Sequence, residues 1–106
     1  VEALPIFLAN ATAELLGLTR RWTAAEISIE HGHVGPGYAI LSDEGRAAID
    51  MAAREEGMIL DPVYTAKGFA GLIGCVRTGV IAGGSSVLFL HSGGSPALFH
   101  FARQLA

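Results

Sequence analysis

The glycine loop 92–94 is the part of the chain best suited to binding a ligand. It follows the apolar run 86–90 and precedes Ser95 and Pro96, which suit the N-cap and the first position of a helix. Glycines let a ligand approach the backbone, and the N-terminus of a helix offers unpaired N–H groups to an anion. The loop is therefore a candidate ligand site, although a pair of glycines after a strand also occurs for geometric reasons alone.

The other reactive side chains give weaker evidence of a functional site than the glycine loop does. His31 and His33 lie two residues apart and could ligate a metal, but no cysteine or acidic cluster supports them, so surface histidines are favoured. His91 follows the apolar run and is expected to be a hydrogen-bonded core histidine. Asp61 could orient another group, but it also precedes a proline, which is ordinary turn chemistry. Cys75 is expected to be a small core residue. We predict no metal site.

Composition and charge argue against several classes of function. The net charge is −3 and the basic residues are scattered, so neither nucleic acid nor a membrane surface is expected as a partner. No apolar run approaches the roughly 18–20 residues that cross a bilayer. The sequence contains no dinucleotide fingerprint, Walker loop or Gly-x-Ser-x-Gly elbow. The single cysteine excludes an internal disulfide and fits a cytoplasmic location.

The elements that would position the loop are read from periodicity and capping residues. We expect helices from about 3 to 18, from the N-cap Ser42 to the cap Gly57, from 65 to 78, and from about 96 to 104. Strict alternation predicts a strand at 26–30, and the apolar run 86–90 predicts a buried strand. Together they predict an α/β fold with helices around a few parallel strands, whose ligand sites lie at the carboxyl ends of the strands.

Glycine recurs every third residue in the expected helix 65–78, at Gly68, Gly71 and Gly74. Each glycine costs a helix interior about 1 kcal/mol relative to alanine, so this face must come close to something. Tight packing against a neighbouring helix or sheet is favoured over direct approach to a ligand.

A chain of 106 residues has room for one domain at most. Its hydrophobic content of 51% is high for this size, which suggests that part of it faces a missing partner, either another subunit or more of the same polypeptide. The chain begins with Val1 and an apolar pattern from Glu2, so we expect it to be cut from something longer.

Three segments carry a resemblance to a known family: VGPGY at 34–38, LDPVYTAK at 60–67 and VLFLHSGGSPALF at 87–99. In this order they resemble the C-terminal third of the D-cysteine desulfhydrase and 1-aminocyclopropane-1-carboxylate deaminase family. The stretch 8–17 also looks like the helix before the first motif. These are fold-type-II pyridoxal-phosphate enzymes, akin to the tryptophan synthase β chain. The resemblance implies that residues 1–106 are the C-terminal part of the lyase's large cofactor domain.

The resemblance implies roles for five positions. Tyr64 matches a tyrosine whose ring packs against the pyridine ring of the cofactor, and Tyr38 matches a second tyrosine near the substrate, so both are candidate catalytic residues. Ser92 matches the position whose hydroxyl meets the pyridine nitrogen, and Thr65 is its neighbour. Gly93, in the same loop as Ser92, completes the cofactor-binding set.

Thr65 and Ser92 also bear on the substrate, because the resemblance implies a glutamate and a leucine there in the deaminases. A carboxylate beside the pyridine nitrogen keeps it protonated, as opening an unactivated cyclopropane requires. Hydroxyls suffice for expelling a thiolate, so this pair favours conversion of D-cysteine to pyruvate, hydrogen sulfide and ammonia. Deamination of 1-aminocyclopropane-1-carboxylate and release of sulfite from L-cysteate remain alternatives.

Two departures from the family pattern matter. Residues 39–41 replace the glycine and proline that commonly follow the loop tyrosine. Lys67 is the only lysine, and by position it is not the lysine that bonds the cofactor. We therefore expect the chain to be inactive alone and to need the N-terminal part of the same protein, within a homodimer. An alternative of another class is a non-catalytic structural or association fragment.

Overall fold

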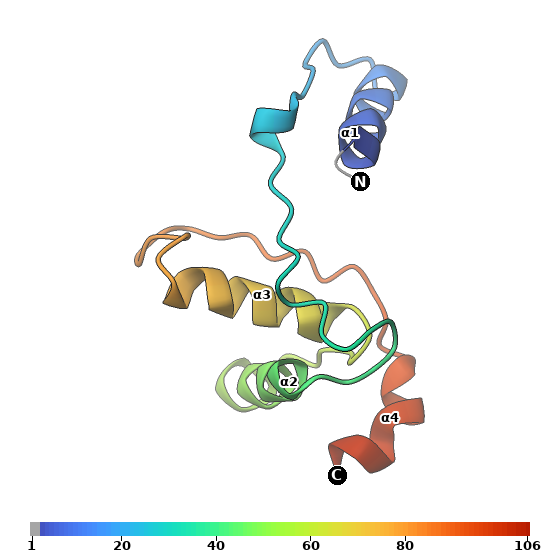
Figure 1. The fold of residues 1–106 in the computed structure, drawn as a ribbon. Coiled ribbons are helices and arrows are strands. Elements are labelled where there is room, and N and C mark those ends of the chain that lie inside the picture. Colours follow the sequence, from blue (N-terminus) through green and yellow to red (C-terminus); the bar gives the residue numbers. More distant parts are fainter. Residues whose placement is uncertain (1–2) are drawn as a thin grey trace. The chain divides into compact units, whose positions relative to one another are not determined.

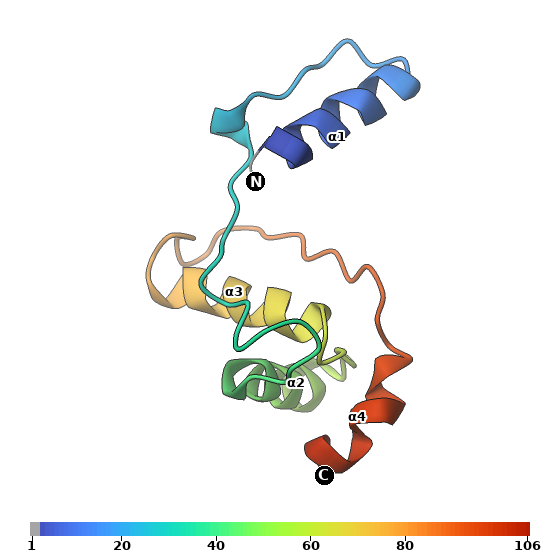
Figure 2. The ribbon, with the colours of Figure 1, turned by 45° about the vertical axis from the view of Figure 1, so that its right-hand side comes forward.

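The computed structural model describes residues 3–106 and contains four α-helices (Figure 1; Figure 2). The residues group into two compact units, one ending at Glu30 and the other comprising His31–Ala106. Glu2, where the predicted helical pattern begins, lies outside the described residues. The first unit contains helix α1 and the 3₁₀ turn η1, and the second contains helices α2, α3 and α4. Their bounds are Ala3–Leu15 (α1), Ala24–Glu26 (η1), Asp43–Glu56 (α2), Thr65–Arg77 (α3) and Ala97–Leu105 (α4).

The predicted α/β fold is wrong for this chain, because residues 3–106 contain no strand. At 26–30, Glu26 belongs to η1, where its carboxylate accepts hydrogen bonds from the backbone and hydroxyl of Thr23. At 86–90, Leu88 is 96% exposed rather than buried. A strand exists through hydrogen bonds to a neighbouring strand. Side-chain patterns at 26–30 and 86–90 suggested strands, but neither segment finds a neighbour here.

In the first unit, α1 confirms the predicted N-terminal helix. The helix ends at Leu15, and Gly17 follows in the left-handed conformation with φ 68°. The Asn10 side chain donates to Trp22 O at 3.0 Å and accepts from Trp22 N–H at 2.8 Å, which ties α1 to the segment that follows. Ala13 is the buried residue of α1, whereas Leu4, Phe7, Leu8 and Leu15 are exposed.

In the second unit, α2 and α3 pack against each other (Figure 1). The predicted caps of α2 are confirmed: the Ser42 hydroxyl accepts from Gly45 N–H at 3.1 Å, and Gly57 ends the helix at φ 65°. The core cluster is built on small and aliphatic side chains, which allow close approach of the helices: Ala52, Leu60 and Ala66, with Ile49, Met58, Phe69 and Phe89 packed against them.

The glycine face of α3 is explained by packing, as predicted, although its partners are side chains from irregular segments. The Phe89 ring lies against Gly68, and the imidazole of His33 lies against Gly71 and Gly74. A Cβ at Gly68 would stand 3.7 Å from the Phe89 ring, an ordinary contact, whereas one at Gly74 would stand 2.5 Å from His33 Nε2. A side chain at residue 74 can therefore be accommodated only if the His33 ring moves.

Candidate functional site

The buried carboxylate of Asp61 organises the start of α3. Its Oδ1 accepts hydrogen bonds from the backbone N–H groups of Val63 and Tyr64, both at 2.8 Å. Its Oδ2 accepts from the N–H of Thr65 at 2.9 Å and from the Thr65 hydroxyl at 2.6 Å. The hydroxyl in turn accepts from Asp61 N–H at 2.8 Å. Asp61 thus satisfies N–H groups that a helix start leaves without partners, and fixes the backbone of Tyr64.

Electrostatics keep this carboxyl ionised. Burial raises the pKa of Asp61, but the hydrogen bonds from the Thr65 hydroxyl and from three backbone N–H groups lower it by more, so its pKa lies below the ordinary range. The negative charge therefore persists at neutral pH, and the groups that donate hydrogen bonds to it belong to residues 63–65.

The glycine loop 92–94 is held beside Asp61. A Cβ at Gly94 would collide with the Asp61 carboxylate, so the backbone of the loop lies directly against it. His91 Nε2 donates to Ile59 O at 2.9 Å, which fastens the segment before the loop to the segment before Asp61. His91 itself is exposed, so its predicted place in the core is wrong, although its hydrogen bond is confirmed.

Tyr38 and Tyr64 meet, although 26 residues separate them in the chain. Their hydroxyl oxygens are 2.6 Å apart, and their rings pack edge to face with centroids 5.9 Å apart. Both side chains are exposed, Tyr38 by 75% and Tyr64 by 54%. The hydrogen bond with Tyr38 raises the pKa of Tyr64 above its ordinary value, and partial burial and the negative charge of Asp61 raise it further. The phenol of Tyr64 therefore stays protonated.

Lys67 helps to hold the loop that carries Tyr38. Its ammonium group, Nζ, donates to Gly37 O at 2.5 Å, from the first turn of α3 to the residue before Tyr38. This hydrogen bond gives Lys67 a structural role. The next residue, Ala39, has φ 55°, a left-handed conformation that the glycine commonly expected near this position would adopt without strain.

The predicted site residues fall into two groups. Tyr38 and Tyr64 are brought together with their rings exposed, and Ser92 and Gly93 are exposed in the loop beside Asp61, with open space around Gly93. Thr65 is different, because its hydroxyl is buried and bonded to Asp61. The roles of these five residues toward a cofactor stay predictions.

For Asp61 the sequence had left two roles open, orienting another group and ordinary turn chemistry, and the structure shows that its carboxylate orients the start of α3. The available signal was a threonine four residues after the aspartate, at the first position of a helix. His33 was misjudged as a surface residue, since its side chain is only 24% exposed and lies against α3. No group of three or more potential metal ligands occurs among the residues described. None of the helices described is long and apolar enough to span a membrane.

The side chains present suit part of a pyridoxal-phosphate site. The exposed tyrosine rings could pack against a flat heterocycle, and Ser92 with the open backbone of Gly93 could meet its polar edge. The amine of Lys67, the only lysine of the sequence, is hydrogen-bonded to Gly37 O. These residues could therefore form one wall of such a site.

Comparison with known proteins identifies the relatives of the chain. No family model matches it. It is 44% identical over 97 residues to the 1-aminocyclopropane-1-carboxylate deaminase of Methylobacterium nodulans, covering 92% of this chain and 29% of that protein. The chain is homologous to part of the 1-aminocyclopropane-1-carboxylate deaminases. The proteins of that name from Rhizobium rhizogenes and Burkholderia ambifaria are 42% and 43% identical, over 95% and 90% of this chain.

These matches confirm the predicted resemblance to the D-cysteine desulfhydrase and 1-aminocyclopropane-1-carboxylate deaminase family. The chain spans 30% or less of the length of each of these deaminases. The names favour the deaminase, which the sequence motifs had placed second, over the D-cysteine desulfhydrase, which they had placed first. They leave open what Thr65 and Ser92 mean for the substrate.

Proposed function

We propose that this chain is part of a pyridoxal-phosphate-dependent lyase that acts on a small amino acid, with 1-aminocyclopropane-1-carboxylate as the first candidate substrate. The observation that carries the proposal is the identity of 44% over 92% of the chain to a protein named for that activity. The pairing of Tyr38 with Tyr64 supports it, because it exposes two phenols side by side.

The tyrosine pair has a proton to give. Two protonated phenols hold two protons, and a single hydrogen bond between their oxygens uses one of them. The second O–H is free to donate to a substrate atom on which negative charge develops. The hydrogen bond with Tyr38 raises the pKa of Tyr64, so at neutral pH Tyr64 keeps the proton that this bond uses. Tyr64 or Tyr38 would thus hold or deliver a proton at a phenol oxygen.

Pyridoxal phosphate, when bound, supplies an electron sink for the carbon atoms of the amino acid. In this chain Tyr64 would pack against its ring, Ser92 would meet the ring nitrogen, and the open backbone at Gly93 would let it approach. Thr65 would act through Asp61, by keeping the start of α3 in place.

D-Cysteine is the second candidate substrate, and specific residues favour it. Neither position 65 nor position 92 carries a carboxylate, and the Asp61 carboxylate is taken up by its own hydrogen bonds. A pyridine nitrogen facing hydroxyls is a weaker electron sink, which is sufficient for a good leaving group such as a thiolate. L-Cysteate, which would release sulfite, is a third substrate consistent with the same residues.

The decisive experiment uses the full-length parent protein with pyridoxal phosphate. Ammonia release from 1-aminocyclopropane-1-carboxylate, sulfide release from D-cysteine and sulfite release from L-cysteate are measured side by side. We expect a much higher kcat/KM for one substrate, the cyclopropane first. The variants Tyr38→Phe and Tyr64→Phe should each lower kcat on it by about 100-fold or more, whereas Glu14→Gln on α1 should not. Absence of all three activities would refute the proposal.

We further propose that the rest of a longer cytoplasmic polypeptide, assembled as a homodimer, supplies the lysine that bonds the cofactor. Support comes from the share of the deaminases that the chain spans and from the engagement of Lys67. Pyridoxal phosphate added to the 106-residue chain should give no protein-bound absorption band that depends on Lys67. A band lost in Lys67→Met would contradict this, and a parent that binds no cofactor would favour a non-catalytic association fragment.

A further inference from the structure

The loop that carries Tyr38 has weak support from its own backbone. Its internal hydrogen bond, from Ile40 N–H to Gly37 O, is long at 3.4 Å. Ala39 adopts φ 55°, a left-handed conformation that strains a residue with a side chain. Tyr38 is itself largely exposed. The position of the Tyr38 hydroxyl must therefore depend on contacts that other residues of the loop make with the helices.

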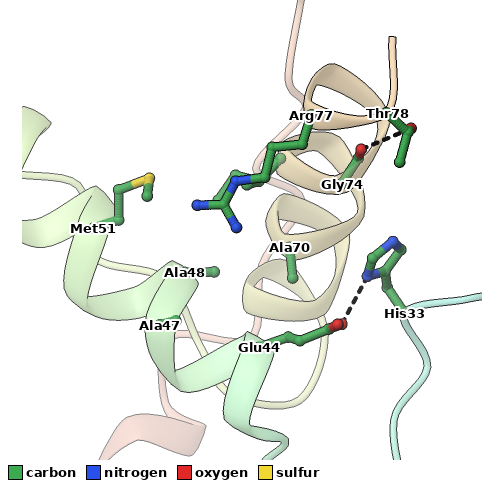
Figure 3. A pocket seen from close by; sticks show the side chains of 10 residues that line it. His33, Glu44, Ala47, Ala48, Met51, Ala70, Gly74, Arg77 and Thr78 are labelled. Carbon is green, nitrogen blue, oxygen red and sulfur yellow. Dashed lines mark hydrogen bonds and ion pairs between the residues drawn. The ribbon is translucent and has the colours of Figure 1, made fainter. Parts of the chain in front are cut away.

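His33 makes such contacts with both α2 and α3. Its Nδ1–H donates to Glu44 Oε2 at 2.8 Å, with Glu44 reaching across from the first turn of α2 (Figure 3). The other edge of the imidazole lies against the glycine face of α3. A Cβ at Gly71 would stand 3.6 Å from His33 Cδ2, and one at Gly74 would stand 2.6 Å from His33 Cε1. The ring therefore occupies space that exists only because residue 74 is glycine.

We propose that His33 is a positioning residue for the tyrosine pair: its imidazole, seated on Gly71 and Gly74 and bonded to Glu44, fixes the loop so that the Tyr38 hydroxyl meets that of Tyr64. Lys67, which donates to Gly37 O, is the second tether of the same loop. His33 touches neither tyrosine in any hydrogen bond or ring contact recorded among the described residues, so it acts through the backbone between residues 33 and 38.

The surroundings of His33 allow the ring to move without unfolding the helices. A hollow of about 300 Å³ lies between α2 and α3 beside the imidazole, and Figure 3 shows the side chains around it. The residues that line this hollow include Met51, Ile73 and Arg77. A methyl group at residue 74 would push the far end of the His33 ring, which can swing toward the hollow or toward solvent. Displacement of His33 is therefore separable from loss of the fold.

The test uses the 106-residue chain and observes the pair directly, because Tyr38 and Tyr64 are its only tyrosines. Nuclear Overhauser effects between the two labelled rings report their contact, and the Cζ shifts report phenol ionisation. His33→Ala and Gly74→Ala should abolish the ring-to-ring effects and lower the pKa of Tyr64 toward that of a free phenol. Gly68→Ala is the matched control, since its new methyl group meets Phe89 at an ordinary distance and leaves His33 in place.

Glu44 provides a second matched pair. Glu44→Gln retains a side-chain oxygen that can accept from His33 Nδ1–H, so it should preserve the tyrosine contact. Glu44→Ala removes the acceptor while changing the charge equally, so it should weaken the contact. Circular dichroism confirms that each variant is folded. Folded His33→Ala and Gly74→Ala that both retain the wild-type ring contacts and the raised pKa of Tyr64 would overturn the proposal.

The inference rests on the proposed function only for the role given to the pair. In an active parent protein, His33→Ala should lower kcat by about 10-fold to 100-fold. It should add no further loss in a Tyr38→Phe background, because a positioning residue loses its effect with the group that it positions. An inactive parent would refute the proposed function, while the ring contacts in the short chain would still decide the role of His33.

Discussion

Tyr64 and Tyr38 form one pair, but the chain holds them in opposite ways. Tyr64 is fixed from within its own segment, because Asp61 accepts from its N–H and lies three residues away. Tyr38 lies in a loop whose tethers come from elsewhere, with Lys67 reaching Gly37 across 30 residues and Glu44 reaching His33 across 11. The position of Tyr64 is therefore set by local structure, and that of Tyr38 by packing between distant residues. Substitutions that remove these contacts should affect the two tyrosines differently.

The largest effect should follow removal of the local anchor. Asp61→Ala leaves the N–H groups of Val63, Tyr64 and Thr65 without their buried acceptor, so the free energy of unfolding should fall by about 3 kcal/mol. Urea denaturation followed by circular dichroism measures it. Asp50→Ala, at an exposed position on α2, should change stability by less than about 0.5 kcal/mol. Equal losses in the two variants would show that Asp61 anchors nothing.

A second test addresses the contact between the anchor and the glycine loop. Gly94→Ala drives a methyl group into the buried Asp61 carboxylate, whereas Gly93→Ala places one in open space, and both residues have positive φ. Backbone strain is thus incurred by both variants and the collision by only one. We expect Gly94→Ala to be the less stable of the two by about 1–3 kcal/mol, as measured by thermal and urea denaturation. Similar stabilities would mean that the loop does not lie against Asp61.

Acid should weaken the hydrogen bonds that hold the backbone of Tyr64, because the Asp61 carboxylate accepts them. The folded-state pKa of Asp61 is lower than the ordinary value of about 3.9, so the folded chain binds this proton less readily than the unfolded chain. The stability that Asp61 contributes is therefore complete above about pH 5 and is lost as the pH falls through the folded pKa. Urea midpoints between pH 7 and pH 2.5 should fall more steeply for the wild type than for Asp61→Asn. Parallel curves would contradict the lowered pKa.

The smallest effect concerns the strained loop on the Tyr38 side. Ala39→Gly relieves a left-handed conformation and should raise the free energy of unfolding by up to about 1 kcal/mol, after the entropy of the new glycine is counted. The same substitution at Ala47, an exposed position within α2, should lower stability by a similar amount. In denaturant unfolding, we expect the midpoint of Ala39→Gly to lie above that of the wild type and the midpoint of Ala47→Gly to lie below it. A decrease for Ala39→Gly would show that the loop is not strained.

The accuracy of each prediction from the sequence depends on how far apart in the chain the interacting residues lie. The caps Ser42 and Gly57 were predicted correctly, because a cap involves residues within a turn of one another. The strands at 26–30 and 86–90 were predicted wrongly, because a side-chain pattern does not reveal whether a neighbouring strand exists. The family resemblance placed Tyr38 and Tyr64 near one cofactor, but their hydrogen bond was not predicted, since nothing local connects residues 26 apart.

By itself, the sequence determined the helices α2 and α3, their ends and the family to which the chain is related, because each of these depends on residues that are close in the chain or in fixed order. The three-dimensional arrangement was needed to show that Asp61 binds the N–H of Tyr64 and lies against Gly94. It was also needed to show that Phe89 and His33 pack against the glycine face of α3. The physical reason is steric. The structural role of a glycine or a buried carboxylate depends on which atoms occupy the space beside it. Those atoms belong to distant parts of the chain.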